Sequence, residues 1–152
     1  MKLKLDVGAL LLTAALASSL CAGAWAQEAG MVKTSRGKVV IERQGLQVPA
    51  LPGAKVMASD RLVTGADGSA GITLIDNTLL TVGPNSSMSL DRFAFDSTTH
   101  QGALEASIKR GTLAVVSGKI AKASPEAVQF RTPHSILGVR GTEFIIEAGV
   151  EQ

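Results

Sequence analysis

Few residues in this chain have the types and spacing that catalysis or zinc binding requires. The two histidines, His100 and His134, stand 34 residues apart, and neither has a neighbouring cysteine or a repeated carboxylate ligand. Residues 35–38 match the S-x-x-K spacing of one class of serine nucleophile, but no helix is expected there. The chain contains neither a phosphate-binding P-loop nor a G-x-S-x-G motif. We therefore expect a protein that is not an enzyme and that uses no cofactor.

Three further stretches carry groups that bind ions. Residues 67–69 and 96–98 offer oxygen ligands of the kind calcium prefers, but tight turns and solvated loops need the same residues, so we expect no metal site. Arg140 has three open interpretations: a solvated strand residue, a buried arginine whose donors satisfy turn carbonyls, or a contact for an anion.

The first 26 residues have the organisation of a secretory signal peptide. Lys2 and Lys4 form a basic start, residues 7–20 are apolar, and residues 24–26 form an A-x-A site that predicts cleavage after Ala26. A retained membrane anchor and lipidation at Cys21 are the alternatives, although the apolar run is short for a span and the residues before Cys21 fit a lipoprotein site poorly. The pattern predicts a periplasmic or secreted protein with no membrane span after cleavage.

Charge and aromatic content exclude several classes of ligand for the mature chain. Loss of Lys2, Lys4 and Asp6 lowers 15 basic and 13 acidic residues to 13 and 12, a net charge of about +1. This balance provides no basic surface for nucleic acid or an anionic membrane. Cleavage also removes the only tryptophan and the only cysteine, and the chain has no tyrosine. Aromatic stacking surfaces for sugars or nucleic-acid bases are therefore not expected. Disulfides are not expected either.

The remaining sequence is organised as short alternating strands between turns. Residues 27–36 lack periodicity and are expected to form a flexible leader, residues 37–148 a single β domain, and residues 149–152 a tail. Expected strands cover 37–43, 46–48, 60–64, 70–75, 78–82, 88–95, 104–108, 112–117, 128–130, 135–139 and 143–148. The sequence predicts a positive-φ turn at 67–68, a bulge near 91–92, a turn at 110–111 and a loose connection over 118–126. This spacing is typical of an all-β, antiparallel sandwich or barrel.

Several of these turns and strand ends, taken in order, carry a resemblance to a known family. The pattern T-P-x5-V-R-G-T-x-F over residues 132–144, preceded by T-G-x-x-G over 64–68, resembles the periplasmic domain of the FecR family. The residues that carry it are Thr64, Gly65, Gly68, Thr132, Pro133, Arg140, Gly141, Thr142 and Phe144.

The resemblance implies a jelly-roll-like β domain outside the cytoplasmic membrane, with a β-solenoid as the alternative fold. Such domains occur in regulators that relay the state of an outer-membrane receptor to an anti-sigma segment, and also alone in exported proteins. This chain has no helical segment before its apolar stretch and ends eight residues after Phe144. We therefore expect a stand-alone exported module.

Two hypotheses follow for its function. The first is an interaction module that contacts an envelope protein or a second copy of itself; the second is a binding domain for a small ligand or an envelope polymer. The strand over 143–148 has no later hairpin partner, so we expect its edge to be the contact. Gly141 is expected to have a positive φ or a close neighbour.

Overall fold

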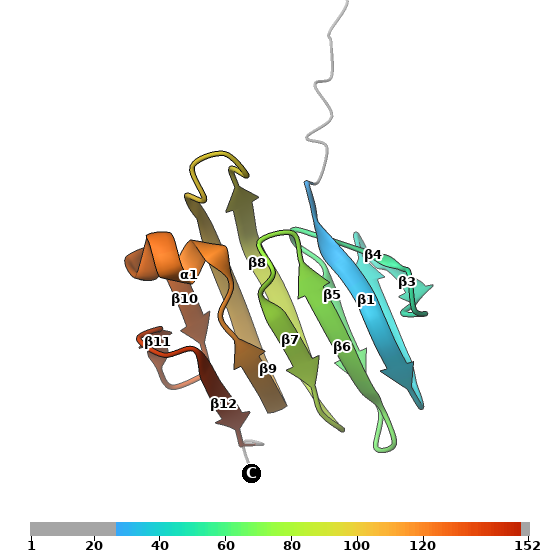
Figure 1. Cartoon of the computed structure of the whole chain (residues 1–152). Coiled ribbons are helices and arrows are strands. Elements are labelled where there is room, and N and C mark those ends of the chain that lie inside the picture. The colour runs from blue at the N-terminus through green and yellow to red at the C-terminus, as the bar shows by residue number, and fades with distance from the viewer. Residues whose placement is uncertain (1–26, 150–152) are drawn as a thin grey trace, which may run out of the picture.

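A computed structural model describes residues 27–149 as an all-β molecule (Figure 1). The expected signal peptide and cleavage site at Ala26 lie outside these residues, as do the last three residues of the expected tail. The strands are β1 (Glu28–Arg36), β2 (Val39–Arg43), β3 (Leu46–Pro49), β4 (Lys55–Met57), β5 (Arg61–Thr64), β6 (Ser69–Leu74), β7 (Leu79–Val82), β8 (Ser87–Phe95), β9 (Gly102–Val116), β10 (Val128–Arg131), β11 (Ile136–Gly138) and β12 (Glu143–Ala148). A short helix, α1 (Lys119–Ala123), and a 3-10 turn, η1 (Pro125–Ala127), follow β9.

The 12 strands form one curled sheet with β9 at its centre. Its main path runs β3-β2-β5-β8-β9-β7-β6-β1-β4, with antiparallel pairing at every step. The first part of β9 pairs with β8 and, in parallel, with β10; the last part pairs with β7 and β12. Figure 1 shows the half with β1, β6 and β7 in front of the half with β5 and β8. The antiparallel all-β prediction is confirmed.

The core lies between these two halves because alternate residues of each strand point inward. In the front half, Ile72 and Leu80 are 1% exposed, and Leu113 is completely buried. From the facing half, Leu90 and Phe130 point into the same core, and both are buried. This alternation is the pattern from which the strands were predicted.

The prediction of a flexible leader over 27–36 is wrong, because residues 28–36 form β1 and pair with both β4 and β6. Ala29 and Val32 in this strand are completely buried. The register shifts between Glu28 and Gly30 and again between Val32 and Thr34. These shifts break the period of two on which strand prediction depends.

Three predictions about connections have different outcomes. The expected bulge is present, since the β8–β9 register shifts between Leu90 and Arg92. The expected turn at 110–111 is instead a bend within a continuous β9, where Gly111 has φ +89°. The connection expected to be loose over 118–126 contains α1 and the start of η1.

Candidate functional site

The outer edge of β12 is the first candidate site. β12 pairs with β9 from Glu143 opposite Val116 to Ala148 opposite Gly111, and no other strand among residues 27–149 pairs with it. In Figure 1 it lies at the margin of the front half. The edge expected from the sequence is therefore present within the described part of the chain.

The hydrogen-bonding direction of each β12 residue follows from one contact. The N–H of Ser117 donates to the carbonyl of Thr142 at 2.7 Å, so this residue pair is a hydrogen-bonded one. Along two antiparallel strands, hydrogen-bonded and non-hydrogen-bonded residue pairs alternate. The backbone N–H and C=O groups of Phe144 and Ile146 therefore point towards β9. Those of the odd-numbered residues 143, 145 and 147 face the open edge.

The side chains of β12 divide between the two faces. Ile146 is buried, and Phe144 packs edge-to-face on Phe130 with ring centroids 5.5 Å apart. Glu143, Ile145 and Glu147 point the other way, and Ile145 is 73% exposed. Neither glutamate takes part in any of the ion pairs among the described residues. The edge thus presents one apolar side chain between two carboxylates.

A small groove of about 310 Å³ lies beside this edge, between β11 and β12. Its lining comes from Leu137, Gly138, Val139, Arg140, Gly141, Phe144, Ile145 and Ile146. Leu137 is 38% exposed, whereas Val139 is buried. Apart from Arg140 the lining side chains are apolar, so the groove suits an apolar side chain brought to the edge.

The segment 140–142 positions β12 through its backbone. The hydroxyl of Ser117 donates to the carbonyl of Gly141 at 2.8 Å, next to the bond that Thr142 accepts. Gly141 has no positive φ, and a Cβ there would meet nothing closer than the Glu143 carbonyl oxygen at 4.0 Å. The conformational role expected for Gly141 is therefore wrong.

Arg140 is exposed, and its side chain makes no hydrogen bond or ion pair with the residues described. The interpretation of Arg140 as a buried arginine that satisfies turn carbonyls is therefore wrong. Arg140 is one of the residues that line the groove beside β12.

Thr132 and Pro133 lie at a different place, in the turn between β10 and β11. Thr132 donates its N–H to the Ser135 carbonyl at 2.8 Å, and its hydroxyl accepts from the N–H of His134 at 3.4 Å. Beside the turn is a depression of about 570 Å³ that Lys109, Arg110 and Arg131 also line. These contacts explain the T-P pair as the closure of a turn.

Thr64, Gly65 and Gly68 lie at one end of the sheet, where they join neighbouring turns. The Thr64 hydroxyl donates to the Gly83 carbonyl at 2.6 Å and accepts from the N–H of Ser86 at 2.9 Å. Gly65 donates to the Lys38 carbonyl at 2.9 Å. A side chain at Gly68 would collide with that same carbonyl, so glycine is required there by close approach.

The positive φ expected at Gly68 is not found. The nine family-motif residues therefore occupy three separate places, and only 140–144 adjoin the open edge.

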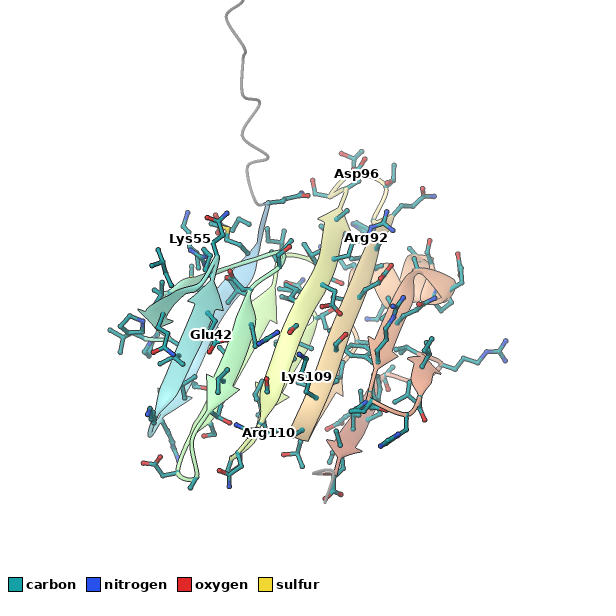
Figure 2. All side chains as sticks on the ribbon, turned by 180° about the vertical axis from the view of Figure 1, so that it is seen from behind. Glu42, Lys55, Arg92, Asp96, Lys109 and Arg110 are labelled. Carbon is teal, nitrogen blue, oxygen red and sulfur yellow. The ribbon has the colours of Figure 1, made fainter. Side chains whose placement is uncertain are left out.

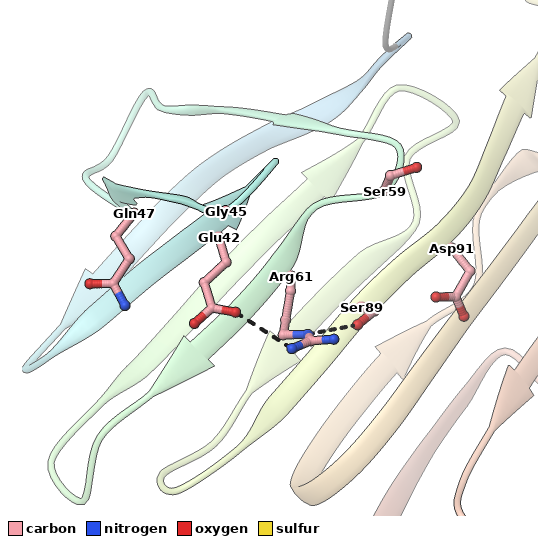
Figure 3. Close-up of a pocket in the computed structure, with 7 residues that line it drawn as sticks. All are labelled: Glu42, Gly45, Gln47, Ser59, Arg61, Ser89 and Asp91. Carbon is pink, nitrogen blue, oxygen red and sulfur yellow. Dashed lines mark hydrogen bonds and ion pairs between the residues drawn. The ribbon is translucent and has the colours of Figure 1, made fainter.

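The second candidate site is a polar groove that the sequence did not indicate (Figure 3). It encloses about 580 Å³ and is lined by Glu42, Gly45, Gln47, Ser59, Arg61, Ser89 and Asp91. Arg61 lies 3.6 Å from Glu42 and donates to the Ser89 hydroxyl at 3.4 Å. Asp91 accepts a hydrogen bond from Ser107. These residues come from four strands and two loops, and only their pairing brings them together.

Charged side chains extend beyond this groove. Figure 2 shows Glu42, Arg92, Lys109 and Arg110 distributed over the reverse face of the molecule. Both signs are present, and Glu105 lies 3.6 Å from both Arg92 and Arg131. The face therefore carries charges of both signs.

Two further features are absent from residues 27–149. These residues contain no group of three or more His, Cys, Asp or Glu side chains arranged to hold a metal ion. They also contain no helix with the length and apolar character needed to cross a membrane.

Comparison with known proteins gives one match. A family model described as FecR protein matches residues 60–152, which is more than half of the chain. No curated protein and no solved structure matches the chain. The matched region contains every residue on which the sequence resemblance was based, and FecR is a regulatory, non-enzymatic family. The chain therefore belongs to the FecR family.

Proposed function

We propose that the protein is an exported, non-enzymatic interaction module that contacts a protein partner in the cell envelope through the edge of β12. Membership of a regulatory family supports a role in binding, and the expected signal peptide supports export. The observation that carries the proposal is the edge itself, where Ile145 is 73% exposed and the adjoining backbone has no strand beside it within residues 27–149.

An open edge of this kind favours one mode of binding. The backbone N–H and C=O groups of residues 143, 145 and 147 can hydrogen-bond an extended segment, which then continues the sheet. Natural sheets tend to shield such edges, because any exposed strand can pair with them. At β12 the shielding consists of two glutamates, while the apolar Ile145 stays exposed between them.

Photo-crosslinking in intact cells tests this proposal. A photoreactive amino acid would replace Ile145 in one strain and Leu46, which is 70% exposed on β3, in a matched control strain. We expect a discrete adduct with one envelope protein from position 145 and none of that adduct from position 46. No adduct at 145, or the same adducts from both positions, would contradict the proposal.

The polar groove supports a second candidate function, the binding of a small ligand or an envelope polymer. The guanidinium of Arg61 lies between the carboxylate of Glu42 and the hydroxyl of Ser89, and such groups bind hydroxyl-rich molecules by paired hydrogen bonds. This function predicts that soluble envelope glycans raise the melting temperature and that Arg61→Ala abolishes the increase. An unchanged melting temperature over a wide glycan concentration range would exclude it for the glycans tested.

A further inference from the structure

We propose that the partner segment at β12 has the pattern basic-apolar-apolar-apolar-basic. This inference rests on the proposed function and specifies the chemistry of its partner. It commits to an extended segment of another protein that pairs antiparallel with β12. The pattern follows from the direction of each side chain of β12, from its charges and from the groove beside it.

The basic positions follow from Glu143 and Glu147. Both side chains lie on the outer face of the sheet, where their neighbours in β9 are Val116 and Thr112. No cation on the adjacent strand therefore faces them directly. A residue directly opposite in a paired strand lies on the same face at a Cβ separation of about 5 Å. Lysine or arginine at those two places would meet an available carboxylate, and an acidic residue would be repelled.

The three apolar positions follow from the residues between the glutamates. Opposite Ile145, a partner side chain would share the outer face with an exposed isoleucine. Opposite Phe144 and Ile146, partner side chains would point inward, and the groove of about 310 Å³ adjoins these two residues. Leu137 and Val139 add further apolar lining there, beside Arg140. Burial of apolar side chains in this groove would stabilise the added strand.

A second copy of the chain fits the edge poorly. Antiparallel pairing of residues 143–147 in two β12 strands is centred on Ile145 and places Glu143 of each copy opposite Glu147 of the other. Like charges in directly opposite positions destabilise a strand pair. The same glutamates that favour a basic segment therefore disfavour self-association through β12.

Binding of two matched peptides tests the pattern. The protein would be purified from cells expressing the full-length gene, and nitrogen-15 NMR would follow its backbone amides. One peptide contains Lys-Val-Leu-Val-Lys and the other Glu-Val-Leu-Val-Glu, each between Ser-Thr pairs. We expect the lysine peptide to bind about tenfold more tightly, because two cross-strand pairs change from opposite to like charge. Binding should protect the amides of Ile145 and Glu147 from exchange.

Reversing the charge of Glu143 and Glu147 in the protein complements the comparison of the two peptides. The double variant Glu143→Lys/Glu147→Lys should reverse the preference in favour of the glutamate peptide. Glu147→Lys should reduce the preference, whereas Glu126→Lys, with the same net charge, should retain it because Glu126 lies on η1. Unchanged amide protection in the β9–β12 ladder would verify that the variants are folded.

Three results would overturn the inference: equal binding of both peptides, binding of neither, or concentration-dependent protection of Ile145 without peptide, which indicates a second copy. Each of these leaves the crosslinking result at position 145 to decide the proposed function separately. A specific crosslink combined with failure of the lysine peptide would show that the edge binds a partner of different chemistry.

Discussion

At Gly111 the long strand β9 passes from one half of the sheet to the other. The residue has φ +89°, and a side chain there would collide with Ser86. Ser86 accepts a hydrogen bond from the Thr112 N–H at 3.0 Å and donates to the Pro84 carbonyl at 3.0 Å. The bend of β9 is therefore fixed both by the backbone conformation at Gly111 and by the turn packed against it.

The first prediction compares two glycines. Gly111→Ala should lower the free energy of unfolding by about 3 kcal/mol, because it combines a strained positive φ with a steric collision. Gly141→Ala should change it by less than about 0.5 kcal/mol, since no positive φ and no close neighbour oppose a side chain there. Urea melts of both variants measure the difference. Equal midpoints would show that the bend in β9 tolerates an ordinary residue.

The second prediction concerns the loop between β8 and β9. Hydrogen bonds to the Asp96 carboxylate from the backbone N–H of Thr98 at 2.8 Å, and then of Thr99 at 3.2 Å, lower the pKa of Asp96 below that of an ordinary aspartate. The charged form is favoured in the folded state, so this stabilisation is present at neutral pH and is lost as the pH falls through the lowered pKa. Carboxyl-carbon NMR should give a midpoint below that of aspartate in an unstructured peptide. A midpoint at or above that value would show that the two bonds do not persist.

Single residues were the least predictable level of this structure. An arginine can satisfy buried turn carbonyls and a glycine can adopt a positive φ, yet Arg140 is exposed and Gly141 is unstrained. Gly111 looked like an ordinary turn glycine but lies inside a strand. The difference depends on which chain segment packs opposite, and that information is not local in sequence.

Among the elements, α1 depends on a buried carboxylate in the turn between β6 and β7. Asp76 is completely buried and accepts hydrogen bonds from the Thr78 hydroxyl at 2.8 Å, the Thr78 N–H at 3.1 Å and the Ile120 N–H at 3.3 Å. Its carbonyl also accepts from the Lys119 N–H at 2.8 Å. These bonds attach the helix after β9 to the front half of the sheet.

The third prediction follows from this attachment. Asp76→Ala should lower the free energy of unfolding by about 2 kcal/mol, because buried donors of Thr78 and Ile120 lose their acceptor. Asp76→Asn retains one acceptor oxygen and should be less destabilising. Urea melts measure the total effect, and exchange of the amides in 120–123 reports the attachment of α1. Unchanged exchange there in Asp76→Ala would show that α1 is held by other contacts.

Elements with strict alternation could be predicted from sequence, and those without it could not. β6 alternates half-buried and buried residues and β7 alternates exposed and buried ones, and the bounds of both strands are predicted within one residue. β1 was missed because two register shifts interrupt its alternation. α1 is only five residues long, too short for a helical period to be recognised.

For the molecule as a whole, family membership and the open edge of β12 support the same role. The matched region begins at residue 60, so β1 to β4 precede it although they complete the same sheet. The strand that carries the edge could be predicted from sequence, because residues 143–148 are rich in β-forming residues. The polar groove could not, since the spacing of Glu42, Arg61 and Asp91 along the chain shows no motif.

The fourth prediction tests export. Mass spectrometry of the protein from the periplasmic fraction should find Gln27 as the first residue, because residues 24–26 provide the expected cleavage site. The product should show almost no absorbance at 280 nm, since the single tryptophan is Trp25 and the chain has no tyrosine. Recovery of a lipid-modified Cys21 from the membrane fraction would contradict this processing.

Residue-resolved hydrogen exchange of β12 tests the central claim most directly. In a monomeric, partner-free sample, the amides of Phe144 and Ile146 should exchange slowly because they bond to β9, whereas those of Ile145 and Glu147 should exchange at least about tenfold faster because they face the open edge. Addition of the partner identified by crosslinking should slow amide exchange at Ile145 and Glu147 and at no other residue of β12. Uniformly slow exchange over 144–147 in the partner-free monomer would show that the edge is already covered and that partner binding occurs elsewhere.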